Sequence, residues 1–181
     1  MAAHGDQRAA AFSQQLRQAH QYLREQLAGV RDELGRDQPA ENGLQVHCLA
    51  FCSALTTHHE GEDGGMFTDL LDARPDLAPV IKNLVDDHVA MAAILRQVRA
   101  LAEQAKTSPA ESLPRLQREL DGLTAITESH FGYEERAIST ALDALRDTGW
   151  SRPVFSPGGP RPDGGPPPGG PEAESQARSA G

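Results

Sequence analysis

Two short stretches of the chain combine imidazole and carboxylate side chains at the spacing of one helical turn. His58 is followed four residues later by Glu62, and the same pair of residue types recurs as His130 and Glu134. Residues at positions i and i+4 project from one face of a helix, so a ring nitrogen and a carboxylate oxygen can reach a common ion. Each stretch therefore predicts half of a metal site.

Single histidines, His20 and His88, lie inside the two other helical patterns of the chain. One histidine on an apolar helix face is commonly a hydrogen-bonded core residue, because histidine is intermediate in burial. Four such histidines, one for each predicted helix, are more than packing explains. With a rise of ~1.5 Å per residue, counting along antiparallel helices places all four within about one turn of a common level.

These histidines and the two glutamates offer more donors than one ion needs. A tetrahedral zinc takes four protein ligands, or three and a water, so two ions with both glutamates bridging fit the count better. One ion then takes His20 and His58 and the other takes His88 and His130, which leaves open positions for small molecules on each. Mixed imidazole and carboxylate donors favour iron or manganese over calcium, although zinc or copper could bind in vitro.

The elements that must position these residues are four helices, because four stretches carry apolar residues at alternating steps of three and four. The first spans about residues 7–34, the second starts near residues 42–44, the third opens after Pro75, and the fourth follows a polar connection at residues 106–112. Short connections between such helices predict an all-α, up-down-up-down four-helix bundle. Between the candidate ligands, the inward positions are Leu16, Leu23, Leu27, Val30 and Leu34; Leu44, His47, Phe51 and Leu55; Leu77, Ile81, Leu84, Met91, Leu95, Val98 and Ala102; and Leu116, Leu120, Leu123, Thr127, Ala137 and Ala141.

Local signals predict where these helices begin and end. Gly35 stops the first helix, and Asn42 is a candidate N-cap for the second. The pair Gly64-Gly65 either kinks or ends the second helix, or precedes a last turn or two that reaches Leu71. Residues 108–111 resemble a capping box for the fourth helix, with Pro114 leaving its exact start open.

Composition places these helices in one acidic domain. The chain has 181 residues, a formal net charge of -9 and a pI near 5.2, which argues against nucleic acid or anionic membrane as partners. It has no apolar signal-peptide core and no membrane-length apolar run, so we expect a cytoplasmic protein. We expect a flexible N-terminus at residues 1–6, a bundle at 7–150, and a Pro/Gly-rich, disordered C-terminal tail at 151–181.

The two cysteines, Cys48 and Cys52, are four residues apart on one face of the second helix. Free cysteine usually behaves as a small buried hydrophobe, so we interpret both as core residues. A redox pair or an additional metal ligand is the alternative. Two cysteines do not make the disulfide framework of a small secreted domain.

The register of the second helix has an alternative, because His59 and Asp63 repeat the same spacing one residue further on. The apolar seam through Leu55 favours His58 with Glu62. In that register, His59, Glu60 and Asp63 support the ligands from outside or lie at the surface, with Glu60 as a possible additional ligand. Asp87 either accepts a hydrogen bond from a ligand imidazole or is a solvated charge. Tyr22 and Tyr133 either line the pocket or are ordinary half-buried aromatics. His4 and His47 have no assignment.

The ordered set of motifs resembles the hemerythrin-like (HHE cation-binding) proteins. The matching features are His20 within Ala-His-Gln-Tyr-Leu-Arg, residues 58–63 followed by Met66-Phe67, His88 within Asp-Asp-His, and residues 130–134. The resemblance covers about residues 10–146, and it implies a four-helix bundle that holds two non-haem iron ions, with manganese or zinc as less favoured occupants. The ligands that it implies are His20, His58, Glu62, His88, His130 and Glu134.

The chain departs from the oxygen-carrying hemerythrins in two places. Those proteins have a second histidine four residues before the one matching His88, where this chain has Leu84. Their last carboxylate is an aspartate five residues after its histidine, whereas Glu134 stands four residues after His130. With one imidazole fewer, the resemblance favours turnover of oxygen or peroxide, or sensing, over reversible oxygen carriage.

Two functions follow as hypotheses. The first is a di-iron protein, with or without enzymatic turnover, that binds a small oxidant such as oxygen, hydrogen peroxide or nitric oxide at open metal positions. The alternative is an iron- or oxygen-responsive module, without turnover, in which metal occupancy stabilises the fold and a protein partner of unknown identity detects it.

Overall fold

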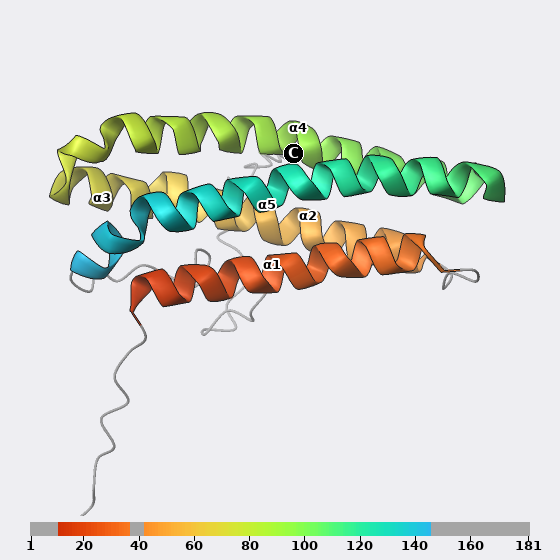
Figure 1. Ribbon diagram of the computed structural model, residues 1–181, viewed down its shortest axis with the longest axis horizontal. Helices are drawn as coiled ribbons and strands as arrows, with labels where there is room; N and C mark the ends of the chain where they lie inside the picture. Colours follow the sequence, from red (N-terminus) through yellow and green to blue (C-terminus); the bar gives the residue numbers. More distant parts are fainter. Residues whose placement is uncertain (1–10, 37–41, 146–181) are drawn as a thin grey trace, which may run out of the picture.

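The 3.6-residue periodicity of the sequence is realised as long helices in the computed structural model, which describes residues 11–36 and 42–145 (Figure 1). The longest are α1 (Phe12–Leu34), α2 (Gly43–Gly61), α4 (Ala78–Thr107) and α5 (Leu113–Ala144). Every element in these two ranges is helical, which confirms the all-α prediction. The predicted N-terminal segment 1–6 and tail 151–181 lie outside the described residues, as do His4 and the outermost residues of the predicted 7–150 domain.

The four rods lie side by side, and successive rods run in opposite directions (Figure 1). Helix α1 packs against α2 and α5, and α4 packs against the same two helices from the other side. A residue on the inner face of any rod therefore points toward a shared axis, where it meets residues from the three other rods.

The second rod does not end at its glycines, contrary to the first of the two expectations for Gly64-Gly65. Helix α2 leads into a π-helical turn, η1 (Glu62–Met66), and then into α3 (Phe67–Ala73). The Phe67 N–H donates to the Glu62 carbonyl, five residues back, so the turn holds one residue more than an α-helical turn. Both glycines therefore lie inside a helical stretch that continues without a break from α2 through η1 to α3.

Of the two predicted N-caps, one is realised in part and the other is not realised. Asn42 stands at the N-cap of α2 with φ 62°, yet its side chain makes no capping hydrogen bond. The capping box predicted at residues 108–111 is wrong. A 3₁₀ turn, η3 (Ala110–Ser112), fills the connection, α5 begins at Leu113, and Ser112 makes no side-chain cap. Another 3₁₀ turn, η2 (Pro75–Leu77), precedes α4.

The apolar interior is divided into two clusters by a layer of polar side chains. Most of the predicted inward residues are buried, whereas His47, Leu77, Leu123 and Ala137 are only half-buried. One cluster extends from the layer toward the end of the bundle that holds Leu34, Leu44 and Leu101, and it includes both cysteines; the other surrounds Leu16, Met66 and Ile138. The layer between them consists of His20, His58, His59, Glu62, His88, His130 and Glu134, all buried.

Cys48 and Cys52 are core residues, as the apolar interpretation predicted. Both are buried, and their Sγ atoms lie 3.9 Å apart as free thiols. They pack with apolar residues of α1 and α4 in the first cluster. Among the described residues, no helix is long and apolar enough to cross a membrane.

Candidate metal centre

The polar layer takes one or more donors from each of the four rods. His20 comes from α1, His88 from α4, and His130 with Glu134 from α5. His58 and His59 come from the last turn of α2, and Glu62 from the first residue of η1. The structure thus brings together all six residues that the sequence singled out, and it adds His59 to them. Their role as ligands stays a prediction.

Four of these residues surround one point, which we call the His20 position: His20, His58, Glu62 and Glu134. The Nε2 atoms of His20 and His58 lie 3.1 Å apart, and the His58 Nε2 is 3.1 Å from the Glu62 Oε1. The His20 Nε2 is 3.3 Å from the Glu134 Oε2. Donors bound to one ion at roughly 2.1 Å lie about 3 Å apart, so these separations suit a shared ion.

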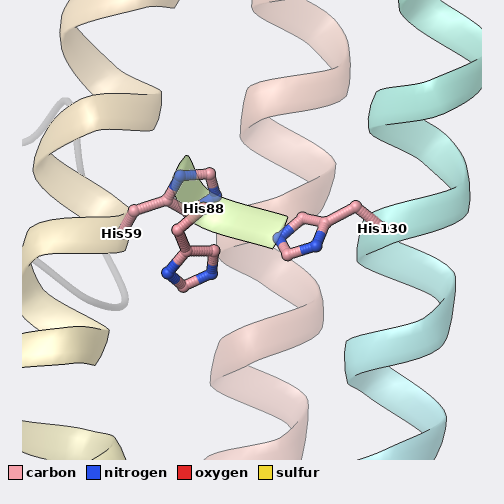
Figure 2. A group of neighbouring side chains, drawn as sticks. All are labelled: His59, His88 and His130. Atoms are coloured by element: carbon pink, nitrogen blue, oxygen red, sulfur yellow. The ribbon is translucent and has the colours of Figure 1, made fainter. Parts of the chain in front are cut away.

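A second point, which we call the His88 position, lies among His59, His88 and His130. Figure 2 shows the three rings gathered together, with His130 reaching in from α5. The His59 and His88 rings are stacked with centroids 3.9 Å apart, and the His130 ring stands edge-on to both, at 5.2 Å from His59 and 5.1 Å from His88. The sequence predicts a supporting or a surface position for His59. The residue is only 6% exposed, which excludes the surface position, and it lies among the candidate donors.

The two glutamates lie between the two positions. The Glu62 Oε1 faces His58, while its Oε2 is 3.5 Å from the His88 Nε2. The Glu134 Oε2 is 3.3 Å from the His20 Nε2 and 3.9 Å from the His130 Nε2. Each carboxylate can therefore reach both positions, as the bridging arrangement predicted from the residue count requires.

The hydrogen bonding of the layer tests whether cations fit it. Among the described residues, eight buried side-chain nitrogen and oxygen atoms make no hydrogen bond, and all eight belong to this layer. Leaving a buried polar atom unsatisfied costs roughly 1–3 kcal/mol, more when it is charged. Such a concentration in a folded core indicates a site built for cations, which would satisfy seven of these atoms; the eighth, the His130 Nδ1, faces Asp87 instead. The eight atoms are the Nε2 of His59 and His88, both ring nitrogens of His130, and both oxygens of Glu62 and Glu134.

Burial and close packing of like charges shift the pKa values of these groups. Burial and the nearby Glu134 raise the pKa of Glu62 well above its ordinary value. Burial, with the neighbouring His88, lowers the pKa of His59 well below its ordinary value, so His59 is neutral and has a lone pair to donate. Burial alone would lower the pKa of His20 as well, but the neighbouring carboxylates of Glu134 and Glu135 more than offset this and raise it.

Three of the imidazoles have a carboxylate at the ring nitrogen that faces outward. The His20 Nδ1 is 2.8 Å from the Glu135 Oε1, and the His88 Nδ1 is 2.8 Å from the Asp63 Oδ1. Asp87 lies farther from its ring, with its Oδ2 3.6 Å from the His130 Nδ1. Such carboxylates orient ligand rings and increase their basicity. Asp63 and Asp87 thus stand where the sequence analysis allowed supporting acceptors, whereas Glu135 was missed.

Arg24 of α1 joins Glu135 into a larger network. Its Nη1 lies 3.3 Å from the Glu135 Oε1, and its Nε donates to the Glu128 Oε2 at 2.7 Å. Its guanidinium also lies 5.3 Å from the centre of the Phe131 ring, which stacks on His20 at 4.3 Å. The His20 ring is therefore fixed on one side by a carboxylate and on one face by an aromatic ring.

The His88 position lies near a surface groove between α4 and α5. The groove has a volume of about 550 Å³, and its lining includes His130, Met91 and Tyr133. Tyr133 therefore lines a pocket beside the centre, whereas the half-buried Tyr22 packs against the apolar cluster. Glu60, the alternative additional ligand, is exposed and belongs to neither group of candidate donors.

Together, the fold and the layer define a helical cation-binding protein whose donors come from every rod. The family model of the hemerythrin HHE cation binding domain matches residues 11–142. The chain belongs to the hemerythrin HHE cation-binding domain family, as its motifs had suggested. Searches of curated proteins and of solved structures gave no match.

Proposed function

We propose that this chain is an up-down-up-down four-helix bundle that holds two non-haem iron ions and binds or turns over a small oxidant beside them. The observation that carries the proposal is the group of eight buried atoms without hydrogen bonds, all within one layer of the bundle. Family membership supports cation binding on independent grounds. Iron is proposed ahead of manganese and zinc because the resemblance to the hemerythrin-like proteins implies it, and imidazole with carboxylate donors suits iron.

The donor count differs between the two positions. Counting the shared carboxylates, the His20 position has two imidazoles and two carboxylates, and the His88 position has three imidazoles and the same two carboxylates. For iron with six coordination positions, the His20 position would retain more free positions. We therefore assign the small oxidant to the ion held by His20 and His58.

His59 also changes the comparison with the oxygen carriers. Leu84 stands where they have a further histidine, and it is fully buried in apolar surroundings. His59 supplies an imidazole from α2 instead, so the donor set again contains five rings. The loss of a ring at position 84 consequently no longer argues against reversible binding of oxygen, and the proposal includes oxygen, hydrogen peroxide and nitric oxide alike.

Bound iron would supply one-electron chemistry and open coordination positions, while the residues of the chain hold, orient and shield it. His20 and His58 would present Nε2 lone pairs, and the carboxylates would balance the charge. Phe131 and the apolar clusters on both sides would exclude bulk water.

A sensor or iron-binding module without turnover is the second candidate. It is favoured by one observation: the donors come from all four rods, so occupancy of the site is coupled directly to the packing of the whole bundle. An ion bound only by the folded chain stabilises it by mass action.

The test of the proposal is metal analysis of protein produced in iron-supplied cells, with optical spectra before and after azide is added. We expect about two irons per chain and a near-ultraviolet charge-transfer band that azide changes. Zinc alone, or no metal, would contradict the proposal. Peroxide decay then separates the candidates, because many turnovers per chain indicate an enzyme, whereas stoichiometric binding indicates a sensor or store.

A further inference from the structure

The hydrogen bond between His20 and Glu135 has a consequence for the ion at the His20 position. A carboxylate only accepts hydrogen bonds, so the His20 Nδ1 must carry the proton that it donates to the Glu135 Oε1 at 2.8 Å. In a neutral ring the other nitrogen, Nε2, then has the free lone pair. That lone pair faces the His58 Nε2 and the Glu134 Oε2, at 3.1 and 3.3 Å. Glu135 therefore selects the ring form that can bind an ion.

Arg24 keeps Glu135 in this place. Its two terminal nitrogens both lie 3.3 Å from the same Glu135 oxygen, and its Nε is anchored by Glu128. The Glu135 side chain is 20% exposed and that of Arg24 26%, so both charges are partly shielded from water. A carboxylate fixed in this way remains negative beside the ring and increases electron donation through it.

The other outward-facing carboxylates are held less firmly. Asp63 bonds His88 at the same 2.8 Å, but its side chain is 39% exposed. Asp87 is 49% exposed and 3.6 Å from His130. An exposed carboxylate is screened by solvent, so its influence on the ring is weaker.

We propose that Glu135, held by Arg24, is a positioning residue for His20 that strengthens ion binding at the His20 position and lowers the reduction potential of an iron bound there. This inference rests on the proposed function, and it adds a named control over the ion to which that proposal assigns the oxidant.

The test compares Glu135→Gln with Glu135→Asp in the full-length chain. Glutamine preserves the length and removes the charge, whereas aspartate preserves the charge at a shorter reach. Titration of the metal-free protein with Co²⁺ measures both affinities through its visible absorption. We expect Glu135→Gln to weaken one of the two ions by about 10- to 100-fold and leave the other unchanged. We expect Glu135→Asp to retain more affinity than Glu135→Gln. In iron-loaded protein, the potential should rise most for Glu135→Gln.

Asp121→Asn is the matched control, because Asp121 of α5 also pairs with an arginine of α1, Arg31, but lies outside the polar layer. It should keep both Co²⁺ affinities close to those of the parent, and circular dichroism of the metal-free variants should show unchanged helix content. A purely structural role would rank glutamine, the closer match in shape, above aspartate, and this ranking would overturn the inference. Parent-like affinity and potential in Glu135→Gln would also overturn it, while the proposed function would stand. A parent protein that binds neither iron nor Co²⁺ would overturn both.

Discussion

The two ion positions share their carboxylates but differ in what lies behind their imidazoles. The His20 position has fewer donors, a ring stacked on Phe131, and the Glu135–Arg24 network. The His88 position has two stacked rings with a third ring edge-on to them, an Asp63 side chain that is 39% exposed, and a groove beside His130. One bundle can therefore give one ion a rigid, shielded surrounding with room for a ligand, and its neighbour a fuller donor set near solvent. The four predictions below test this difference.

The largest effect is expected from Glu62→Gln, because Glu62 faces both positions. We expect the variant to lose both ions and with them the stabilisation by metal, which mass action puts at about 3–4 kcal/mol for each ion when free metal is 100 to 1,000 times its Kd. Metal analysis and thermal unfolding with and without iron measure both quantities. Glu60→Gln, two residues earlier and exposed, should bind two ions like the parent. Two tightly bound ions in Glu62→Gln would contradict the shared role of this carboxylate.

The next largest effects are expected from substitutions at two adjacent residues, His58 and His59, each of which should affect a different ion position. His58→Ala should remove the ion at the His20 position and abolish the spectral response to azide, whereas His59→Ala should remove the other ion and keep that response. Each variant should bind one ion per chain, with affinity at the lost position reduced by more than about 100-fold, beyond what supporting residues give. His47→Ala, on the same helix and half-buried, serves as the control. If His59→Ala binds both ions normally, His59 is not a donor.

Most of the candidate donors could be predicted from the sequence because they lie on the inward faces of amphipathic helices. His20, His88 and His130 replace apolar residues at inward positions, so the periodicity that predicts the helices also predicts the inward direction of these rings.

The predicted capping box is not realised because local residue preferences at 108–111 were outweighed by the 3₁₀ turn that precedes Pro114. Such local conflicts cannot be settled from a sequence pattern.

His59 was not predicted as a candidate donor because helical periodicity places about one inward residue in each turn. A layer that holds two ions is wide, so a residue that is about 100° further around the helix than His58 still faces a donor position. Two features of the sequence together could have indicated His59 as a donor. Leu84 stands where the oxygen carriers have a histidine, and a second histidine directly follows His58. Glu135 was missed because its role depends on the distance between α1 and α5, which no periodicity contains.

A smaller effect is expected from Asp63→Asn, which weakens the support of His88 while preserving its shape. We expect the ion at the His88 position to bind about 10-fold more weakly, at the lower end of the range for such supporting groups, because Asp63 is partly exposed. The Co²⁺ titration used for Glu135 measures this, and Asp72→Asn, exposed on the next helical segment, is the control. An effect on the His20 ion instead would reverse the assignment of the two positions.

The smallest effect is expected from Gly64→Ala in the π turn that leads from Glu62 to Phe67. No atom lies within 4 Å of a Cβ added at this glycine, so alanine should fit and should stabilise the helical backbone by about 0.5–1 kcal/mol. Denaturant unfolding of the metal-free protein measures the change. The variant should still bind two ions; loss of the His88 ion alone would show that this position depends on a deformable turn.

The origin of the donors in all four rods has a consequence for the lifetime of the folded chain. An ion held by His20, His58 and Glu134 joins segments that are distant in sequence, and thus closes large chain loops as a covalent cross-link would. Separating any rod from the others would then require breaking metal bonds as well as exposing apolar surface. Resistance to proteolysis, and with it the amount of protein that persists in a cell, would rise and fall with the iron supply.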